Sequence, residues 1–354
     1  MNNGYPMRAV PGYVNSKPGI QVGTKLEGKV TRENGKLKFD EQGIDFLKQI
    51  GVEWVMLGGH QVPEQTAECY EELKDELLKR GLKIYRIAND RLHNMPSVTL
   101  NLPDRDEYVE RYLQYIRDLG KAGIHYATYA HMGNGIWRGD FRREVRGNAT
   151  AGGLDLEAPS HTIAFGDFHW PLSHGREYTE EELWENYEYF IRKVVPVAEE
   201  SKVYIGIHPD DPPVYTMAGV PRCIFGNFEG YKRALEFAAS PNIGCCLCVG
   251  CWLEGGKKMG ATVEEFIRWL AERKLLFKLH MRNVTAPLDA PGGFNETFPD
   301  AGYYNLIRVM KVLKEVGFDG CIMNDHLIDM VGGHYACEAY FTAYLKGVCD
   351  AVQD

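Results

Sequence analysis

The chain has 354 residues, 44% of them hydrophobic, with a formal net charge of −9 and a pI near 5.7. This length is enough for one large α/β domain or two ordinary ones. The acidic balance argues against nucleic-acid and anionic-membrane partners, because no broad basic field offsets it. The sequence lacks a membrane-length apolar run and a signal-peptide core, and its nine cysteines lack a disulfide-framework spacing. We therefore expect a soluble cytoplasmic protein.

Strand-like and helix-like segments alternate along the chain. Short apolar runs predict strands at 8–13, 52–58, 82–88, 124–130, 203–208, 243–248, 275–280 and 320–325. Amphipathic segments predict helices at 40–50, 66–80, 104–122, 179–200, 227–239, 262–272, 303–316 and 335–349. Eight strands, each followed by a helix, predict a (β/α)₈ barrel that spans residues 1–354 as a single domain. A doubly wound sheet is the alternative that alternation alone leaves open.

Two segments fall outside this alternation. Residues 14–39 are expected to form an insertion with a hairpin around "RENGKL", and residues 133–178 form a longer one after the fourth strand. The second segment shows no helix or strand pattern, yet its aromatic content argues against disorder. We expect it to fold over the carboxyl-end face of the barrel.

The last four predicted strands each end on a residue type that binds metals: His208, Cys248, His280 and Asp325. The carboxyl ends of barrel strands converge on one face, so these four side chains can surround one ion. Two imidazoles, a thiolate and a carboxylate suit a divalent transition metal such as Mn²⁺, Fe²⁺, Co²⁺ or Zn²⁺ better than Ca²⁺ or Mg²⁺.

Each of these residues alone also has an ordinary explanation. A histidine at a strand end is commonly a hydrogen-bonded rim residue, and Cys248 alone would be a small buried hydrophobe. Cys245 and Cys248 have the CxxC spacing of zinc and redox sites, although side chains alternate along a strand. The coincidence of four consecutive strands that each end on a ligand favours one shared metal site.

The motifs around these residues resemble the mannonate dehydratase family, which has a metal-dependent barrel of the xylose-isomerase type. They are "HPDDPP" (208–213), "GVPR" (219–222), "CVG" (248–250), "LHMRN" (279–283), "GGFNETFPDAGYYN" (292–305) and "NDH" (324–326). "LHNMP", "LPDRDEYVERYLQYIRDLGKAGI" (102–124) and "YAHM" (129–132) extend the resemblance over roughly residues 85–350.

The resemblance implies a hydro-lyase that converts D-mannonate to 2-keto-3-deoxy-D-gluconate with Mn²⁺ or Fe²⁺. His208, Cys248, His280 and Asp325 would hold the ion. His326 and Tyr335 would be the acid/base pair, although His326 could instead orient the Asp325 carboxylate. The expected substrate-binding residues are His131, Arg138, Asp210, Asp211, Arg282 and Asn283. For Asp210 and Asp211 a role as turn caps remains open.

Several segments depart from the family pattern. An early tryptophan-containing motif is absent, "GNGIWRGDFRREVRG" (133–147) replaces a usual segment, and "VYTMAG" follows "HPDDPP". These departures lie in segments that are expected to contact the substrate, and the expected metal ligands are intact. The substrate could therefore be another anionic polyhydroxy acid of about six carbons. A metal-dependent isomerase or epimerase and a non-catalytic sugar-acid binder are the alternative functions. Barrels of this type often pair, so a homo-oligomer is an expectation.

Overall fold

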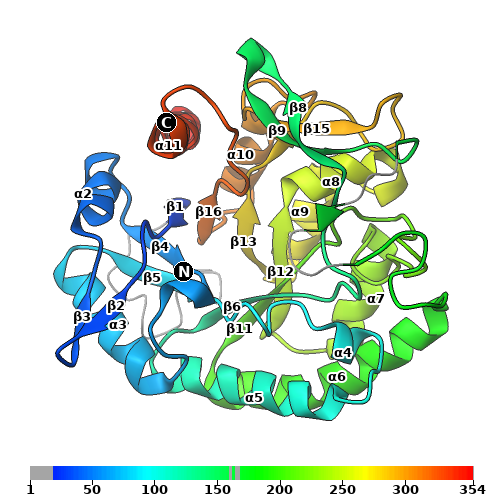
Figure 1. The fold of residues 1–354 in the computed structure, drawn as a ribbon, viewed down its shortest axis with the longest axis horizontal. Coiled ribbons are helices and arrows are strands. Elements are labelled where there is room, and N and C mark those ends of the chain that lie inside the picture. The colour runs from blue at the N-terminus through cyan, green and yellow to red at the C-terminus, as the bar shows by residue number, and fades with distance from the viewer. Residues whose placement is uncertain (1–18, 159–161, 164–167, 354) are drawn as a thin grey trace.

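Eight parallel strands form the central sheet of the computed structural model, which describes residues 19–158, 162–163 and 168–353. In spatial order the strands are β5, β4, β1, β16, β13, β12, β11 and β6. Their bounds are β1 (Gln21–Lys25), β4 (Trp54–Leu57), β5 (Lys83–Ile87), β6 (Tyr126–Ala130), β11 (Tyr204–His208), β12 (Ile243–Cys248), β13 (Leu276–His280) and β16 (Cys321–Met323). Helices surround the strands in Figure 1.

The two end strands of the sheet, β5 and β6, approach each other and nearly close the barrel. The Ala130 N–H donates to the His93 carbonyl at 2.8 Å, and Asn94 forms a parallel bridge with Ala130. This arrangement confirms the predicted (β/α)₈ barrel and excludes the doubly wound sheet.

The helices follow the predicted segments closely, because their apolar faces and caps are local signals. Their bounds are α2 (Glu41–Gln49), α3 (Ala67–Lys79), α4 (Pro96–Thr99), α5 (Arg105–Lys121), α6 (Glu180–Ser201), α7 (Phe228–Ala238), α8 (Val249–Gly255), α9 (Val263–Glu272), α10 (Leu306–Glu315) and α11 (Gly333–Gln353). At the start of α6, the Thr179 side chain accepts from the Glu182 N–H, and the Glu182 carboxylate accepts from the Thr179 N–H. This capping box fixes the helix where the sequence predicts its start.

The first barrel strand corrects one expectation. The predicted strand at 8–13 lies outside the described residues, and β1 pairs in parallel with both β4 and β16. Residues 21–25 are therefore part of the barrel wall and not of an insertion. The expected hairpin is present as β2 (Thr31–Glu33) and β3 (Lys36–Lys38), which pair antiparallel.

Short strands in the 133–178 segment form a cover over the carboxyl ends of the barrel strands. They are β7 (Trp137–Arg138), β8 (Asp140–Glu144), β9 (Thr150–Leu154) and β10 (Thr162–Ile163). β9 pairs with β15 (Phe294–Thr297), which also pairs with β14 (Asn283–Val284). The Trp137 N–H donates to the Asp211 carbonyl at 3.1 Å, just beyond the end of β11.

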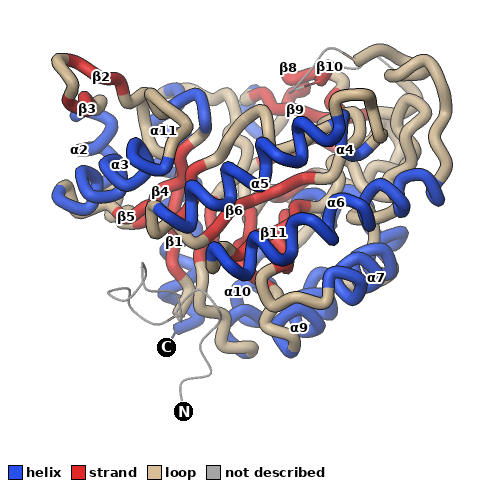
Figure 2. The backbone as a smooth tube through the Cα atoms, turned by 90° about the horizontal axis from the view of Figure 1, so that it is seen from below, coloured by secondary structure: helices blue, strands red, loops and turns tan. Residues whose placement is uncertain are grey.

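Figure 2 shows β8, β9 and β10 together at one end of the barrel. The expected position of this segment is confirmed, whereas the expectation that it lacks strands is wrong. Its strands pair with each other and with β15, far along the chain, so no local alternation reveals them.

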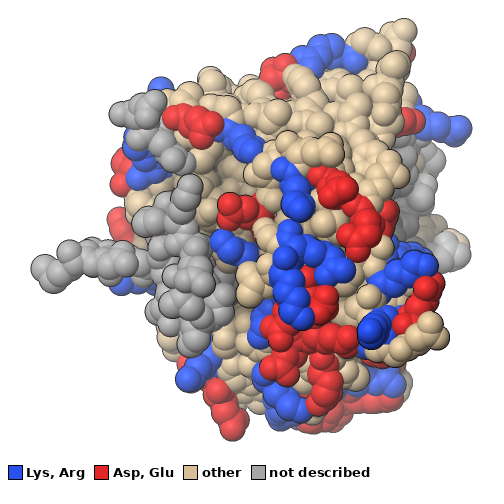
Figure 3. All heavy atoms as spheres, turned by 90° about the vertical axis from the view of Figure 1, so that its left-hand side faces the viewer, with Lys and Arg blue, Asp and Glu red and all other residues tan. Residues whose placement is uncertain are grey.

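The surface agrees with the acidic composition. On the face in Figure 3, lysine and arginine side chains are interspersed with aspartate and glutamate and form no continuous basic field. In the part of the chain that the structure describes, no helix has the length and apolarity to cross a membrane.

Large side chains fill the middle of the barrel. Trp54, Tyr85, Tyr126 and Phe277 belong to one buried cluster, with the Trp54 and Tyr85 rings 5.8 Å apart and edge-on. The Tyr85 hydroxyl donates to the Phe277 carbonyl at 2.5 Å, which joins β5 to β13 through the interior. This cluster supports the face on which the metal-binding residue types converge.

We predict that Tyr85→Phe lowers the free energy of unfolding by about 1–3 kcal/mol, because the buried Phe277 carbonyl loses its donor. Urea denaturation of the variant and the parent protein measures this difference. Tyr108→Phe, on a half-buried residue of α5, is the control. Equal stability of Tyr85→Phe and the parent would contradict a structural role for this hydrogen bond.

Candidate metal centre and active-site cavity

The structure brings the four residues predicted as metal ligands into one group. Each residue offers one ligand atom, and these atoms all lie within 4.8 Å of one another. β11, β12 and β13 end on their ligands, and the fourth ligand follows β16 by two residues; the group is His208, Cys248, His280 and Asp325. Parallel pairing of β11 with β12 and of β12 with β13 places the three strand ends side by side.

The imidazoles are oriented by partners on their far sides. The Nδ1 of His208 lies 2.7 Å from the Pro209 carbonyl oxygen, which can only accept, so Nδ1 carries a proton and Nε2 is the nitrogen available to a metal ion. The Nε2 of His280 lies 3.0 Å from the Lys278 ammonium nitrogen. The Nδ1 of His280 lies 3.4 Å from Asp325 Oδ1.

The other two ligands are anions. Burial raises the pKa of the Cys248 thiol, but a hydrogen bond with the Cys251 side chain and the Arg282 guanidinium more than reverse this and hold its pKa well below the usual range. For Asp325, burial is likewise outweighed by His326, His280 and Arg282, and its pKa is well below the ordinary carboxyl value. Burial would lower the pKa of His208, yet the adjacent Cys248 thiolate raises it to about 9.

This donor set fits a divalent transition metal. The Nδ1 of His280 is buried and has no hydrogen-bond partner among the described residues, although it faces the other three ligands. Two anionic donors 3.7 Å apart, Cys248 Sγ and Asp325 Oδ2, also require a neighbouring positive charge. A cation between them satisfies both conditions.

His326 lies beside this group and faces a carboxylate. Its Nδ1 is 2.6 Å from Glu296 Oε1 and 2.9 Å from an Arg282 nitrogen, and its Nε2 is 3.7 Å from Asp325 Oδ2. The side chain is 32% exposed, in contrast to the buried metal-binding group. When Nδ1 donates its proton to the Glu296 carboxylate in a hydrogen bond, Nε2 can exchange a proton with a small molecule bound beside it.

Arg282 and Arg138 have a different environment from the one predicted. Both guanidinium groups are buried, and both bond to Asp211, Glu254 and Glu296 at 2.5–3.3 Å. Their terminal nitrogens and the Asp211 carboxylate form a buried ion network between the cover and the barrel. The expected contacts of these three residues with substrate stay a prediction.

The other three residues that were predicted to bind substrate, Asn283, His131 and Asp210, also make contacts within the protein. The Asn283 amide donates to the Pro299 and Tyr304 carbonyls. His131 lies in a cluster of aromatic rings, where burial lowers its pKa to about 3 and its Nδ1 contacts the Tyr129 hydroxyl. Both residues therefore have partners within the protein, and their substrate-binding role stays a prediction.

Asp210 is buried 3.7 Å from an Arg222 nitrogen. Burial raises the pKa of Asp210 to about 6. Its backbone N–H donates to the Phe225 carbonyl at 3.0 Å, and both predicted roles of its side chain, substrate binding and turn capping, stay predictions.

Tyr335 does not join the metal-binding group. It lies in the first turn of α11, and its ring packs against Phe46 of α2 with centroids 4.5 Å apart. Among the described residues that line the adjoining cavity, its neighbour His334 is present and Tyr335 is not. The predicted acid/base role of Tyr335 is not supported by this position.

A cavity of about 410 Å³ adjoins the metal-binding group, and His280 and Asp325 form part of its wall. Its other charged side chains are Lys25, Glu27, His60, Arg86, Asp90 and His334. The sequence analysis missed all six. Lys25 lies in a segment that was predicted to be an insertion. Arg86 lies in a predicted strand, but only the apolar residues of that strand entered the prediction.

Two further features near the barrel do not form the site. Glu27, His334 and Glu338 also lie close together, but the Glu338 carboxylate accepts from Thr24, Asn324 and Thr342 and so anchors α11 to the barrel.

A separate hollow of about 480 Å³ lies beside α8 and α9.

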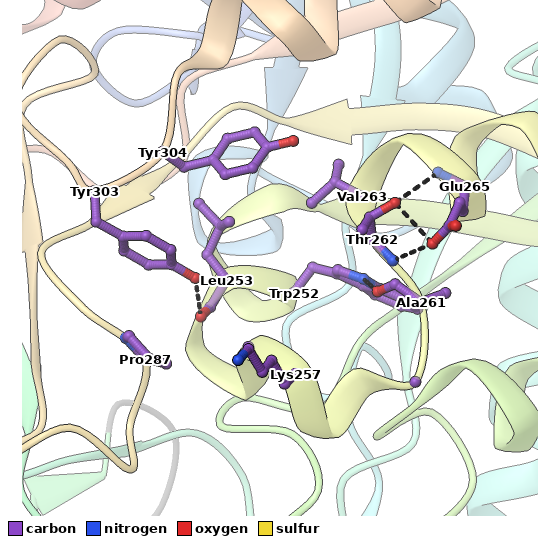
Figure 4. A pocket seen from close by; sticks show the side chains of 12 residues that line it. Trp252, Leu253, Lys257, Ala261, Thr262, Val263, Glu265, Pro287, Tyr303 and Tyr304 are labelled. Carbon is purple, nitrogen blue, oxygen red and sulfur yellow. Dashed lines mark hydrogen bonds between the residues drawn. The ribbon is translucent and has the colours of Figure 1, made fainter.

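Figure 4 shows the hollow's aromatic lining, with the Tyr303 hydroxyl bonded to the Leu253 carbonyl at 2.7 Å. Among the described residues, its charged lining consists of Lys257 and Glu265, and Glu265 caps α9. These groups offer no acid/base or metal chemistry comparable with the barrel cavity.

Known proteins resemble the chain over most of its length. The family model described as D-mannonate dehydratase (UxuA) matches residues 37–354. The mannonate dehydratase of Thermotoga maritima is 30% identical over 319 residues, which cover 82% of this chain and 86% of the relative. The mannonate dehydratase of Streptococcus pneumoniae (strain 70585) is 31% identical over 316 residues, covering 82% of each chain.

Solved structures also resemble the chain over most of its length. The crystal structure of mannonate dehydratase from Streptococcus suis serotype 2 has a TM-score of 0.78 at 27% identity and covers 96% of this chain and 94% of that one. A xylose isomerase domain protein from Planctomyces limnophilus has a TM-score of 0.59 at 11% identity, covers 96% and 99%, and supports the fold alone. The chain belongs to the D-mannonate dehydratase family of hydro-lyases and has a xylose-isomerase-like barrel.

Proposed function

We propose that this protein eliminates water from a sugar acid, either D-mannonate, giving 2-keto-3-deoxy-D-gluconate, or a closely related hexonate. The observation that carries the proposal is the group His208, Cys248, His280 and Asp325, which borders a cavity large enough for a small polar substrate. Family membership supports the reaction class.

We further propose Mn²⁺ or Fe²⁺ as the ion that these four residues hold, because the mixed N, S and O donors suit a divalent transition metal. When bound, such an ion supplies Lewis-acid stabilisation of the negative charge that develops on substrate oxygens. The protein's own residues must then move two protons: one leaves the carbon next to the carboxylate, and one reaches the departing hydroxyl group.

His326 is the residue that we assign to proton transfer. Glu296 fixes the orientation of the ring through Nδ1, and the partly exposed side chain leaves Nε2 accessible beside Asp325. The alternative role, in which His326 only orients Asp325, is less supported, because its short contact is to Glu296 at 2.6 Å and its distance to Asp325 is 3.7 Å.

We predict that metal-loaded protein converts D-mannonate to a product that is lighter by one water. Mass spectrometry of the reaction mixture, over a panel of hexonates and uronates, measures this. A product of unchanged mass would instead identify an isomerase or epimerase, and no product with any acid of the panel would indicate a non-catalytic binder.

Removal of the metal tests the ligand assignment. Dialysis against a chelator is expected to abolish turnover, and added Mn²⁺ is expected to restore it, while the far-UV circular dichroism stays that of a folded barrel. His208→Ala and Asp325→Ala should each lose bound metal by elemental analysis as well as activity. Full activity of the chelated protein would contradict the proposal.

His326→Gln separates proton transfer from metal binding. We expect kcat to fall by about 10²–10⁴-fold, since glutamine cannot exchange a proton, while the metal content stays unchanged. Tyr335→Phe is the matched control, because Tyr335 packs on Phe46 and should leave kcat close to that of the parent. Loss of the metal from His326→Gln, or a large loss of kcat in Tyr335→Phe, would overturn this assignment.

A further inference from the structure

Four of the six ionisable side chains that line the cavity beside His280 and Asp325 form two pairs. The His334 Nε2 contacts both Glu27 carboxylate oxygens at 2.9 and 3.0 Å. The His60 Nδ1 contacts Asp90 Oδ2 at 2.9 Å, and Asp90 also accepts from the backbone N–H groups of Gly59 and His60. These contacts account for four of the six charged side chains that surround the metal-binding group.

Lys25 is also engaged. Its ammonium group donates to the backbone carbonyl of Asp325 at 3.1 Å, which ties β1 to the loop that carries a metal-binding carboxylate. The remaining charged side chain of the cavity lining is Arg86.

Arg86 differs from Arg138 and Arg282 in having no carboxylate partner among the described residues. Arg138 and Arg282 each contact three carboxylates. Within residues 19–158, 162–163 and 168–353, the Arg86 guanidinium has no hydrogen-bond or ion-pair partner, and its Nε is buried without an acceptor. A buried donor left without an acceptor is costly, so its acceptor is expected to come from the cavity.

The position of Arg86 suits a contact with a bound substrate. Arg86 lies on β5, which β4 and β1 separate from β16 in the sheet, whereas the metal-binding residues come from β11, β12, β13 and the end of β16. The guanidinium therefore reaches the same cavity as His280 and Asp325 from a different part of the barrel wall. A small ligand in this cavity can contact both at once.

We propose that Arg86 binds the carboxylate of the substrate and sets the preference of this site for an acid over a neutral polyol. The planar guanidinium presents parallel N–H donors that match the two oxygens of a carboxylate. This inference rests on the proposed function for the identity of the substrate class. In this proposal the acid is recognised by Arg86 and not by Arg282 or Arg138, whose terminal guanidinium nitrogens bond to carboxylates of the protein.

The test compares binding of an acid and of its neutral counterpart. D-mannonate and D-mannitol are titrated calorimetrically into the Mn²⁺-loaded full chain carrying His326→Gln, which prevents turnover, with Arg86 intact or changed. With Arg86 intact, D-mannonate should bind more tightly than D-mannitol. Arg86→Met should lower the affinity for D-mannonate by about 10- to 100-fold, which is the effect of losing one charge-assisted hydrogen-bonded pair. The affinity for D-mannitol should stay unchanged.

Two matched variants refine the result. Arg86→Lys keeps the charge without the fork, so an intermediate loss is expected. Arg91→Met removes the same charge from an exposed residue that lines a different hollow, and should leave both affinities unchanged. Metal content and circular dichroism confirm that each variant is folded and loaded.

The inference is overturned if Arg86→Met leaves D-mannonate affinity unchanged, if it weakens both ligands equally, or if D-mannonate fails to bind with Arg86 intact. Its failure is distinguishable from failure of the proposed function. Arg86-dependent acid preference without loss of water from any hexonate by the parent protein would contradict only the reaction. Turnover by a parent whose Arg86→Met variant keeps its acid preference would contradict only the role of Arg86.

Discussion

The active face of this barrel depends on keeping two anions close together in a buried place. Cys248 Sγ and Asp325 Oδ2 lie 3.7 Å apart, and both pKa values are held well below their usual ranges. Two like unit charges about 4 Å apart repel by about 4 kcal/mol at an effective dielectric constant of 20. The neighbouring histidines and Arg282 offset this repulsion, and a cation held by the four residues would offset it further.

A network of buried ions connects this set to the cover of the barrel. Arg138 comes from β7 in the 133–178 segment, Arg282 follows β13, and both contact Asp211, Glu254 and Glu296. Glu296 also holds His326, which is adjacent to a metal-binding carboxylate. The cover, the proposed proton-transfer residue and the metal-binding group therefore share one network, and an altered cover can change substrate contacts while the metal-binding residues stay fixed.

Much of the fold and the metal-binding group could be predicted from the sequence, because both depend on short-range patterns. Apolar runs of strand length placed seven of the eight barrel strands, and four of those runs end on a residue of the metal-binding group. β1 was missed because "QVGTK" is a short run with three polar residues, and its place in the wall depends on pairing with β4 and β16.

The substrate-binding residues were harder to predict, because the partner of a charged side chain is set by the tertiary structure. Arg282 follows a metal-binding histidine closely in sequence, yet its N–H groups are taken by Asp211, Glu254 and Glu296. Arg86 belongs to no recognisable motif. Only the positions of the carboxylates around the cavity show that it is unpaired among the described residues.

The central claim is that one ion is bound by the four residues from the ends of β11, β12, β13 and β16. X-ray absorption spectroscopy of the Co²⁺-loaded protein tests this directly, because sulfur scatters differently from nitrogen and oxygen, and imidazole rings add their own multiple-scattering features. The account predicts one sulfur, two imidazoles and oxygen in the coordination shell, with the sulfur lost in Cys248→Ser. A shell without sulfur, or one with two sulfurs from neighbouring cysteines, would contradict it.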